Sequence, residues 1–168
     1  KPFYPINGGS VGFLTNKFNE NIDIETLIKN TTKTKINPLY IAIDEIGERK
    51  HALAFNEATL HRQSSQASNL KLTVNKREVI SNLIGDGILV STPYGSTGYN
   101  LSAGGPIMPL SSNLLSITPI CPYKPRKLSG ALIHNDSEIT IEILDHEKRP
   151  VKLTTDNTDY FGIKKILV

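Results

Sequence analysis

Apolar residues alternate with polar or small ones along most of the chain, with the period of a β-strand whose successive side chains point to opposite faces. The alternation is clear in residues 36–46, at Ile36, Leu39 or Tyr40, Ile41 and Ile43. Turn-forming residues follow at 47–50, and residues 52–60 carry a second apolar run. We expect these two runs to pair as a β-hairpin.

Short apolar runs of this kind recur along the rest of the chain, with Gly, Pro, Asn and Asp between them. We predict further strands at residues 70–75, 79–83, 88–91, 114–118, 128–134, 138–144, 151–155 and 161–168. A spacing of about eight to twelve residues between short strands is typical of an antiparallel sandwich. The sequence therefore predicts a mainly β fold, an antiparallel β-sandwich.

Helical patterning is confined to short segments. Residues 21–30 predict a short amphipathic helix near the N-terminus, with acidic Asp23 and Glu25 at its start and apolar positions at Ile22, Ile24, Leu27 and Ile28. Residues 100–103 begin a helix that the following Gly-Gly-Pro ends early. The Gly-rich residues 7–14 precede only a short apolar segment, so they predict a turn and not a phosphate-binding loop that opens a helix.

Composition excludes several classes of protein. The chain has 168 residues, of which 38% are hydrophobic and 21% charged, and no apolar run is long enough to span a membrane. No secretory signal is visible in the first ten residues, and Cys121 is the only cysteine, so we expect a cytoplasmic protein without an intrachain disulfide. The net charge of +3 is too small and too scattered to indicate a nucleic-acid partner.

Residues 85–106, GDGILVSTPYGSTGYNLSAGGP, form the most unusual stretch of the chain. A Gly-Asp-Gly turn leads through the apolar residues 88–90 into a loop rich in glycine and hydroxyl groups. Such a loop is too elaborate for a simple connection. We expect it to hold a polyhydroxylated ligand that carries phosphate.

Two common kinds of active site are not supported. The four histidines and the single cysteine do not occur at metal-ligand spacings, so no metal site is expected within the chain. Ser96 has histidine and aspartate elsewhere in the chain, but Tyr94-Gly95-Ser96-Thr97-Gly98 is not the Gly-x-Ser-x-Gly pattern of a serine hydrolase.

Several polar residues have two readings each when taken alone. Asn56 and Glu57 follow an apolar run, where they either end a strand or recognise a nucleoside through an amide and a carboxylate. Asp86 and Asp156 each form a turn or accept hydrogen bonds from a ligand. Tyr99 either packs or offers a ring face and a hydroxyl.

The order of these residues resembles the NAD kinase family. The resemblance lies in Asn56-Glu57, then Gly85-Asp86-Gly87, then Ser91-Thr92-Pro93-x-Gly95-Ser96-Thr97-x-Tyr99, then Ser102-Ala103-Gly104-Gly105-Pro106, and last Asp156. Flanking residues 12–14 and 56–62 are also similar. The resemblance covers essentially the whole chain.

The resemblance implies an enzyme that phosphorylates the 2′-hydroxyl of the adenosine ribose of NAD to make NADP. The donor is ATP, or polyphosphate in some members, and the reaction uses Mg²⁺. Family members have an N-terminal α/β nucleotide-binding domain followed by a β-rich domain, and they form homodimers or homotetramers. By this resemblance residues 1–35 are the tail of the first domain, and residues 36–168 are the β-rich NAD-binding domain.

The same resemblance implies roles for individual residues. Asn56 and Glu57 match the pair that contacts adenine and its ribose, and Asp86 matches the carboxylate that contacts the nicotinamide half. The segment that lines the NAD pocket is matched by Thr97, Gly98, Tyr99 and Ser102. Asp156 with Asn157 matches a later contact near the same pocket.

Departures from the family pattern are informative. The Gly-Gly-Asp-Gly motif with the catalytic Asp is not in the sequence, so we expect a fragment, with that motif upstream of Lys1 and no catalytic residue in this chain. Gly98 replaces a more usual Ala. Tyr94 stands at a position that is often small or hydroxylated, and Ile84 stands where some members carry a basic residue. A non-catalytic nucleotide-binding or assembly module derived from the same fold is the alternative.

Overall fold

The computed structural model describes residues 3–10, 12, 14–18, 20–21, 23–45 and 47–168. The chain divides into two compact units, Lys1–Lys35 and Ile36–Val168.

The first unit contains two very short strands and one helix. β1 (Ile6–Asn7) pairs in parallel with β2 (Asn16–Lys17), so residues 7–14 connect two strands. α1 (Ile24–Lys29) begins after Asp23, whose carboxylate accepts a hydrogen bond of 2.9 Å from the backbone N–H of Thr26. The predicted short helix is therefore confirmed, although Val11 and Phe13 of the expected turn and Ile22 of the expected helix lie outside the described residues.

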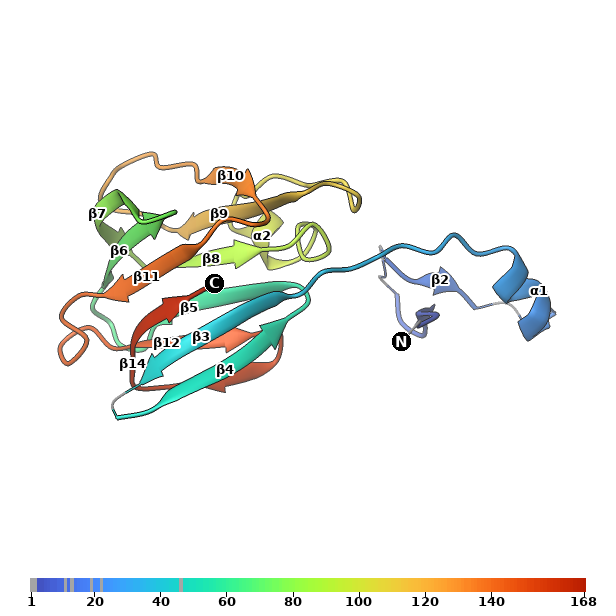
Figure 1. Cartoon of the computed structure of the whole chain (residues 1–168), viewed down its shortest axis with the longest axis horizontal. Helices are drawn as coiled ribbons and strands as arrows, with labels where there is room; N and C mark the ends of the chain where they lie inside the picture. Colours follow the sequence, from blue (N-terminus) through green and yellow to red (C-terminus); the bar gives the residue numbers. More distant parts are fainter. Residues whose placement is uncertain (1–2, 11, 13, 19, 22, 46) are drawn as a thin grey trace. The chain divides into compact units, whose positions relative to one another are not determined.

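The second unit is built from two six-stranded sheets, and every strand pairing within them is antiparallel (Figure 1). One sheet has the order β4 (Arg49–Ala54), β3 (Leu39–Glu45), β14 (Ile163–Leu167), β11 (Ile139–Ile143), β6 (Ser68–Val74) and β7 (Arg77–Gly85). The other has the order β10 (Ala131–His134), β9 (Leu114–Ile120), β8 (Gly87–Ser91), β5 (Glu57–Arg62), β12 (Val151–Thr155) and β13 (Thr158–Tyr160). The predicted mainly β, antiparallel fold is confirmed.

One hydrophobic core joins the inner faces of both sheets. On β3 the side chains of Leu39, Ile41 and Ile43 are buried and point into the core, while Tyr40 is exposed. The prediction left Leu39 or Tyr40 as the inward residue, and the structure shows that it is Leu39. The three buried residues share a cluster with Leu60 of β5 and Leu153 of β12, which lie in the other sheet. Each fully buried side chain of this size contributes roughly 1.5–3 kcal/mol to folding relative to an exposed one.

The single strand predicted at residues 52–60 is wrong, because the structure divides it between β4 and β5 in different sheets. The expected hairpin survives only as the pairing of β3 with β4. Phe55 and Asn56 form the crossing, and their backbone N–H groups donate to the carboxylate of Asp156, 2.8 Å in both cases. The polar pair Asn56-Glu57 interrupts the apolar run here, but this local pattern does not show that the chain continues in the other sheet.

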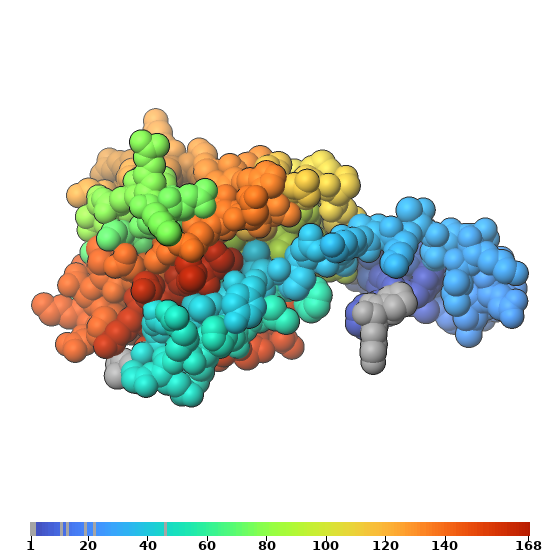
Figure 2. All heavy atoms as spheres, viewed as in Figure 1, coloured from blue at the N-terminus to red at the C-terminus, as the bar shows by residue number. Residues whose placement is uncertain are grey.

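Other differences concern strand ends. β10 starts at Ala131 and is shorter than predicted, and β13 was not predicted because three residues carry no period. The β6–β7 hairpin is longer than predicted, and Figure 2 shows it, in green, protruding from the unit, in agreement with the exposure of residues 75–79. The second short helix is confirmed as α2 (Tyr99–Ser102). Ile46 of the first predicted strand lies outside the described residues.

Candidate functional site

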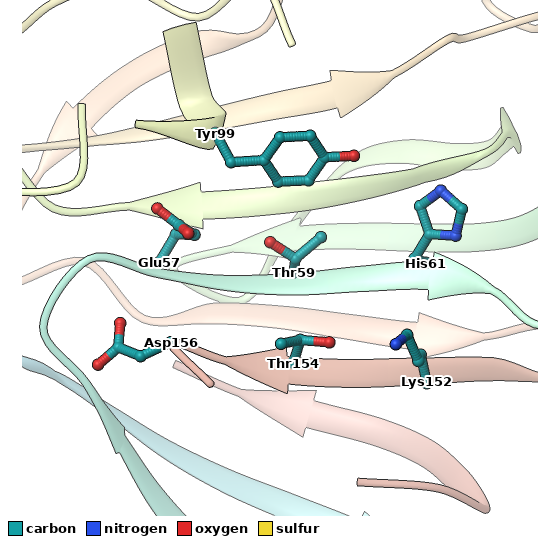
Figure 3. A pocket seen from close by; sticks show the side chains of 7 residues that line it. All are labelled: Glu57, Thr59, His61, Tyr99, Lys152, Thr154 and Asp156. Atoms are coloured by element: carbon teal, nitrogen blue, oxygen red, sulfur yellow. The ribbon is translucent and has the colours of Figure 1, made fainter. Parts of the chain in front are cut away.

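An open pocket of about 270 Å³ lies on the outer face of the second sheet. Its lining side chains come from β5, β12, the turn after β12 and α2, as Figure 3 shows. They are Glu57, Thr59, His61, Tyr99, Lys152, Thr154 and Asp156.

Strand register explains why these side chains meet. β5 and β12 are antiparallel neighbours that place Thr59 opposite Thr154 and His61 opposite Lys152. Alternate residues of a strand share a face, so Glu57, Thr59 and His61 line one side of the floor over about 13 Å. In Figure 3, Tyr99 lies over this floor from the side of α2.

Glu57 has an unusual environment within the pocket. Its Oε2 atom is buried and has no hydrogen-bond partner in the structure. Burial of the carboxylate, and secondarily the negative charge of Asp156, raise the pKa of Glu57 above its usual range. An unpartnered carboxylate oxygen is costly to bury, and a ligand hydroxyl or amine would satisfy it.

The opposite end of the pocket is basic but internally paired. Lys152 Nζ lies 2.9 Å from a carboxylate oxygen of Asp159 on β13, and Thr154 Oγ1 donates to the other oxygen at 2.6 Å. The Thr154 bond first, and then Lys152, hold the pKa of Asp159 below its usual range. The charge of Lys152 is thus already balanced within the sheet.

The hydroxyl-rich loop is built differently from the sequence expectation. Ser91, Thr92 and Ser96 are buried, and their hydroxyls bond to protein carbonyls, as in the 2.6 Å bond from Thr92 Oγ1 to the Phe55 carbonyl. The expectation that these three hydroxyls hold phosphate is therefore wrong, because they donate hydrogen bonds to carbonyls of the protein when the loop packs onto the sheet. Thr97 is half-buried and Ser102 is exposed, so both are accessible.

Asp86 lies away from the pocket lining. It precedes Gly87 of β8, which pairs with His61, whereas Glu57 is at the other end of β5. Its Oδ1 accepts a 2.6 Å hydrogen bond from Nε of Arg62, and the two side chains form an ion pair about one third exposed to solvent. The structure therefore does not bring Asp86 together with Glu57.

Among the other expected site residues, Glu57, Tyr99 and Asp156 line the pocket. Asn56, Gly98 and Asn157 are chain neighbours of lining residues, Ser102 belongs to the same short helix as Tyr99, and Thr97 lies two residues before Tyr99. Sequence reasoning missed Thr59, His61, Lys152 and Thr154. Their signal was present as polar residues at every second position of two apolar strands, starting from Glu57.

Within the part of the chain that the structure describes, no group of three or more His, Cys, Asp or Glu side chains is arranged to hold a metal ion. Over the same residues, no helix combines the length and the apolar character that crossing a bilayer requires.

Comparison with known proteins gives consistent results for sequence and structure. Residues 55–165 match the family model of the ATP-NAD kinase C-terminal domain. The NAD kinase of Rickettsia bellii (strain OSU 85-389) is 43% identical over 171 residues, a match covering 99% of this chain and 66% of the relative. The NAD kinase of Rickettsia felis is 44% identical with the same coverage. The chain thus spans about two thirds of the length of these curated relatives.

Solved structures show the same fold. The crystal structure of yeast NADH kinase complexed with NADH superposes with a TM-score of 0.82 at 25% identity, over 98% of this chain and 49% of that one. An NAD kinase from Archaeoglobus fulgidus in complex with ATP has a TM-score of 0.79 at 24% identity, over 99% of this chain and 64% of that one. At that lower identity the likeness shows the fold.

Proposed function

The chain belongs to the NAD kinase family through its C-terminal domain, and from this premise we propose that it forms the NAD-binding part of an NAD kinase. In the proposed reaction, ATP or polyphosphate phosphorylates the 2′-hydroxyl of the adenosine ribose of NAD to give NADP. The observation that carries the proposal is the buried, unpartnered Oε2 atom of Glu57 in an open pocket beneath Tyr99.

Glu57 suits the recognition of a ribose. A carboxylate accepts hydrogen bonds from two neighbouring hydroxyls, and the deficit at Oε2 is the kind that a ribose hydroxyl removes. Tyr99 offers a ring face for a base, and the amide of Asn56 can donate and accept at a base edge. We assign the adenosine half of NAD to this end of the pocket, with Thr97, Gly98, Ser102 and Asn157 around it.

For Asp86 we propose a contact with the other half of the dinucleotide. Arg62 is bonded to Oδ1 of Asp86, and we assign Oδ2 to the carboxamide of the nicotinamide half. Asp86 and Glu57 lie at opposite ends of β5, so they would contact different halves of a dinucleotide.

The proposed contribution of this chain to catalysis is positioning. Phosphoryl transfer depends on holding the attacking hydroxyl in line with the γ-phosphorus and on neutralising charge at the phosphates. The residues above would aim the 2′-oxygen. We assign no catalytic residue to this chain. In the proposed reaction Mg²⁺ would be bound together with ATP, since the described residues contain no group of three or more His, Cys, Asp or Glu arranged to hold a metal ion.

The short first unit supports the domain assignment. Parallel pairing of β1 with β2 is the arrangement found in α/β domains, so we propose that residues 1–35 are the tail of such a domain. We further propose that the complete enzyme is a homodimer or homotetramer that binds ATP and NADP as well as NAD.

A chimera tests the proposed activity. The segment of the R. bellii NAD kinase that precedes the matched region is fused before this chain, which is 43% identical to that kinase over the 171 matched residues. We expect the chimera to form NADP from NAD and Mg-ATP, and the 168-residue chain alone to form none. A folded chimera without activity, together with a chain that shows no chemical-shift change with millimolar NAD, would refute the proposal.

A further inference from the structure

The crossing at Phe55 and Asn56 poses a hydrogen-bonding problem. β4 ends at Ala54 in one sheet and β5 begins at Glu57 in the other, so the two residues between them leave both strand ladders. Asn56 is partly buried, so its backbone N–H needs a protein partner, while Phe55 is exposed. Asp156 meets this need, because its Oδ2 accepts from Phe55 N and its Oδ1 from Asn56 N, both at 2.8 Å.

Thr92 holds the same crossing from the carbonyl side. Its hydroxyl lies 2.6 Å from the Phe55 carbonyl oxygen, and its backbone N–H donates to the Asn56 carbonyl at 2.9 Å. Gly95 packs so closely on this peptide that a Cβ atom there would overlap the carbonyl of Asn56. The crossing is therefore held by hydrogen bonds on both sides, to Thr92 in the loop after β8 and to Asp156 in the turn after β12.

Asp156 is itself fixed in the orientation that this contact requires. It follows β12 in the tight turn that pairs Thr155 with Thr158, and its φ of 51° lies in the left-handed region, which Asp tolerates better than most residues. Its backbone N–H also donates to the carbonyl of Glu57 at 3.3 Å. Both carboxylate oxygens thus point at the backbone, although the side chain borders the pocket.

We propose that Asp156 is a positioning residue, whose carboxylate fixes the Phe55–Asn56 peptide and so places Asn56 and Glu57 for the ligand without contacting the ligand itself. The identity of that ligand as NAD rests on the proposed function. This assignment differs from the direct contact that the family resemblance implies for Asp156.

The negative charge of Asp156 also affects the pKa of Glu57. Asp156 is a like charge beside Glu57, and it adds to burial in raising the pKa of that group. The other titratable side chains that line the pocket with Glu57 are Tyr99, His61 and Lys152. Replacing Asp156 by a neutral residue should therefore lower the pKa of Glu57.

NMR on the 168-residue chain tests the proposal. In the unsubstituted chain, scalar couplings across the hydrogen bonds from Phe55 N and Asn56 N to the Asp156 carboxyl carbon should persist when NAD is added to saturation. Their loss on NAD binding, or a direct contact between ligand protons and Asp156, would overturn the proposal. This measurement needs no variant, so it stands even if variants fail to fold.

The variant D156N gives the second measurement, with D136N as a control that removes an exposed carboxylate more than two strands away in the same sheet. We expect D156N to shift the Phe55 and Asn56 amide signals, to lower the pKa of Glu57 and to weaken NAD binding about tenfold. D136N should do none of these. Unchanged amides together with an unchanged Glu57 titration in a folded D156N chain would contradict the proposal. If the unsubstituted chain does not bind NAD and the folded chimera is inactive, the proposed function fails, while the amide and Glu57 readouts still decide the role of Asp156.

Discussion

Thr118 on β9 donates a 2.7 Å hydrogen bond from its hydroxyl to the side-chain oxygen of Asn100 on α2, and both residues are buried. The amide nitrogen of Asn100 donates in turn to the carbonyls of Ser96 and Pro106, at 3.3 and 2.9 Å. One side chain thus links the start and the end of the loop to the sheet beneath it. The position of Tyr99 over the pocket depends on this link.

We expect N100A to destabilise the chain by roughly 2–4 kcal/mol, because it removes three hydrogen bonds of a buried side chain and leaves the carbonyls of Ser96 and Pro106 without the amide donor. Thr118 would keep only its bond to the Ser116 hydroxyl. The change should appear as a lower midpoint in urea unfolding with an unchanged slope. L101A in the same helix is the control, since Leu101 is 46% exposed, and it should cost well under half as much. Equal effects of the two substitutions would show that Asn100 does not organise the loop.

Gly95 should not tolerate a side chain. G95A would drive a Cβ atom into the backbone of Asn56, which cannot move without disturbing the crossing, so we expect a loss of about 1–3 kcal/mol. The matched control is G98A in the same loop, whose Cβ would lie 3.2 Å from the Gly95 carbonyl and 3.8 Å from Glu57 Oε2. Thermal unfolding should rank G95A clearly below G98A, and the reverse order would refute the close approach.

Glu57 should make stability depend on pH. Its pKa is raised in the folded state, so the folded chain binds more protons than the unfolded one between the two pKa values, and the free energy of unfolding falls as pH rises through this window. E57Q removes this dependence and should be more stable than the unsubstituted chain above the window, by about 1.4 kcal/mol for each unit of raised pKa. Denaturant unfolding from pH 4 to pH 8 measures the difference. E147Q, in an exposed turn, should run parallel to the unsubstituted chain.

Ligand binding should depend on Glu57 in the opposite sense. If its carboxylate accepts from the ribose of NAD, E57Q weakens binding by about 10- to 100-fold, since a charged hydrogen bond contributes roughly 1.5–3 kcal/mol. Titration calorimetry of the chimera with NAD measures this loss. H61A, at the far end of the same strand, should weaken binding less. A stabilised E57Q variant that still binds NAD with full affinity would remove Glu57 from the proposed site.

The ion pair between Arg62 and Asp86 should add little to stability. Both side chains are about one third exposed, so a double-mutant cycle of R62A and D86A should give a coupling energy of about 0.5–1 kcal/mol that falls with added salt. A coupling above about 2 kcal/mol would indicate a structural role for Asp86 that competes with the proposed contact to the nicotinamide half.

The sequence by itself determined the mainly β architecture, because several strands bury one face and show this as alternation, while β8 and β9 are buried almost throughout and show as short apolar runs. β12 has the predicted bounds, Val151–Thr155, with Val151, Leu153 and Thr155 buried between half-buried Lys152 and Thr154. The same alternation contains the signal for the pocket floor, because the polar residues of β5 and β12 alternate with buried apolar ones. The order of the polar motifs indicates the family. These features depend on local periodicity and composition, which a sequence displays directly.

The tertiary structure alone decided where the chain changes sheets and which polar groups remain available. No local pattern separates Phe55 from the strand before it, since the break depends on Asp156, which is 100 residues distant from Asn56 in the chain. The sequence predicted that the hydroxyls of Ser91, Thr92 and Ser96 contact a ligand, but in the folded chain they donate hydrogen bonds to backbone carbonyls. The sequence offered both Glu57 and Asp86 as carboxylates for a ligand, yet Glu57 has a buried oxygen without a partner and Asp86 is paired with Arg62. Hydrogen-bond partners are set by long-range packing, and that is why the sequence could not supply them.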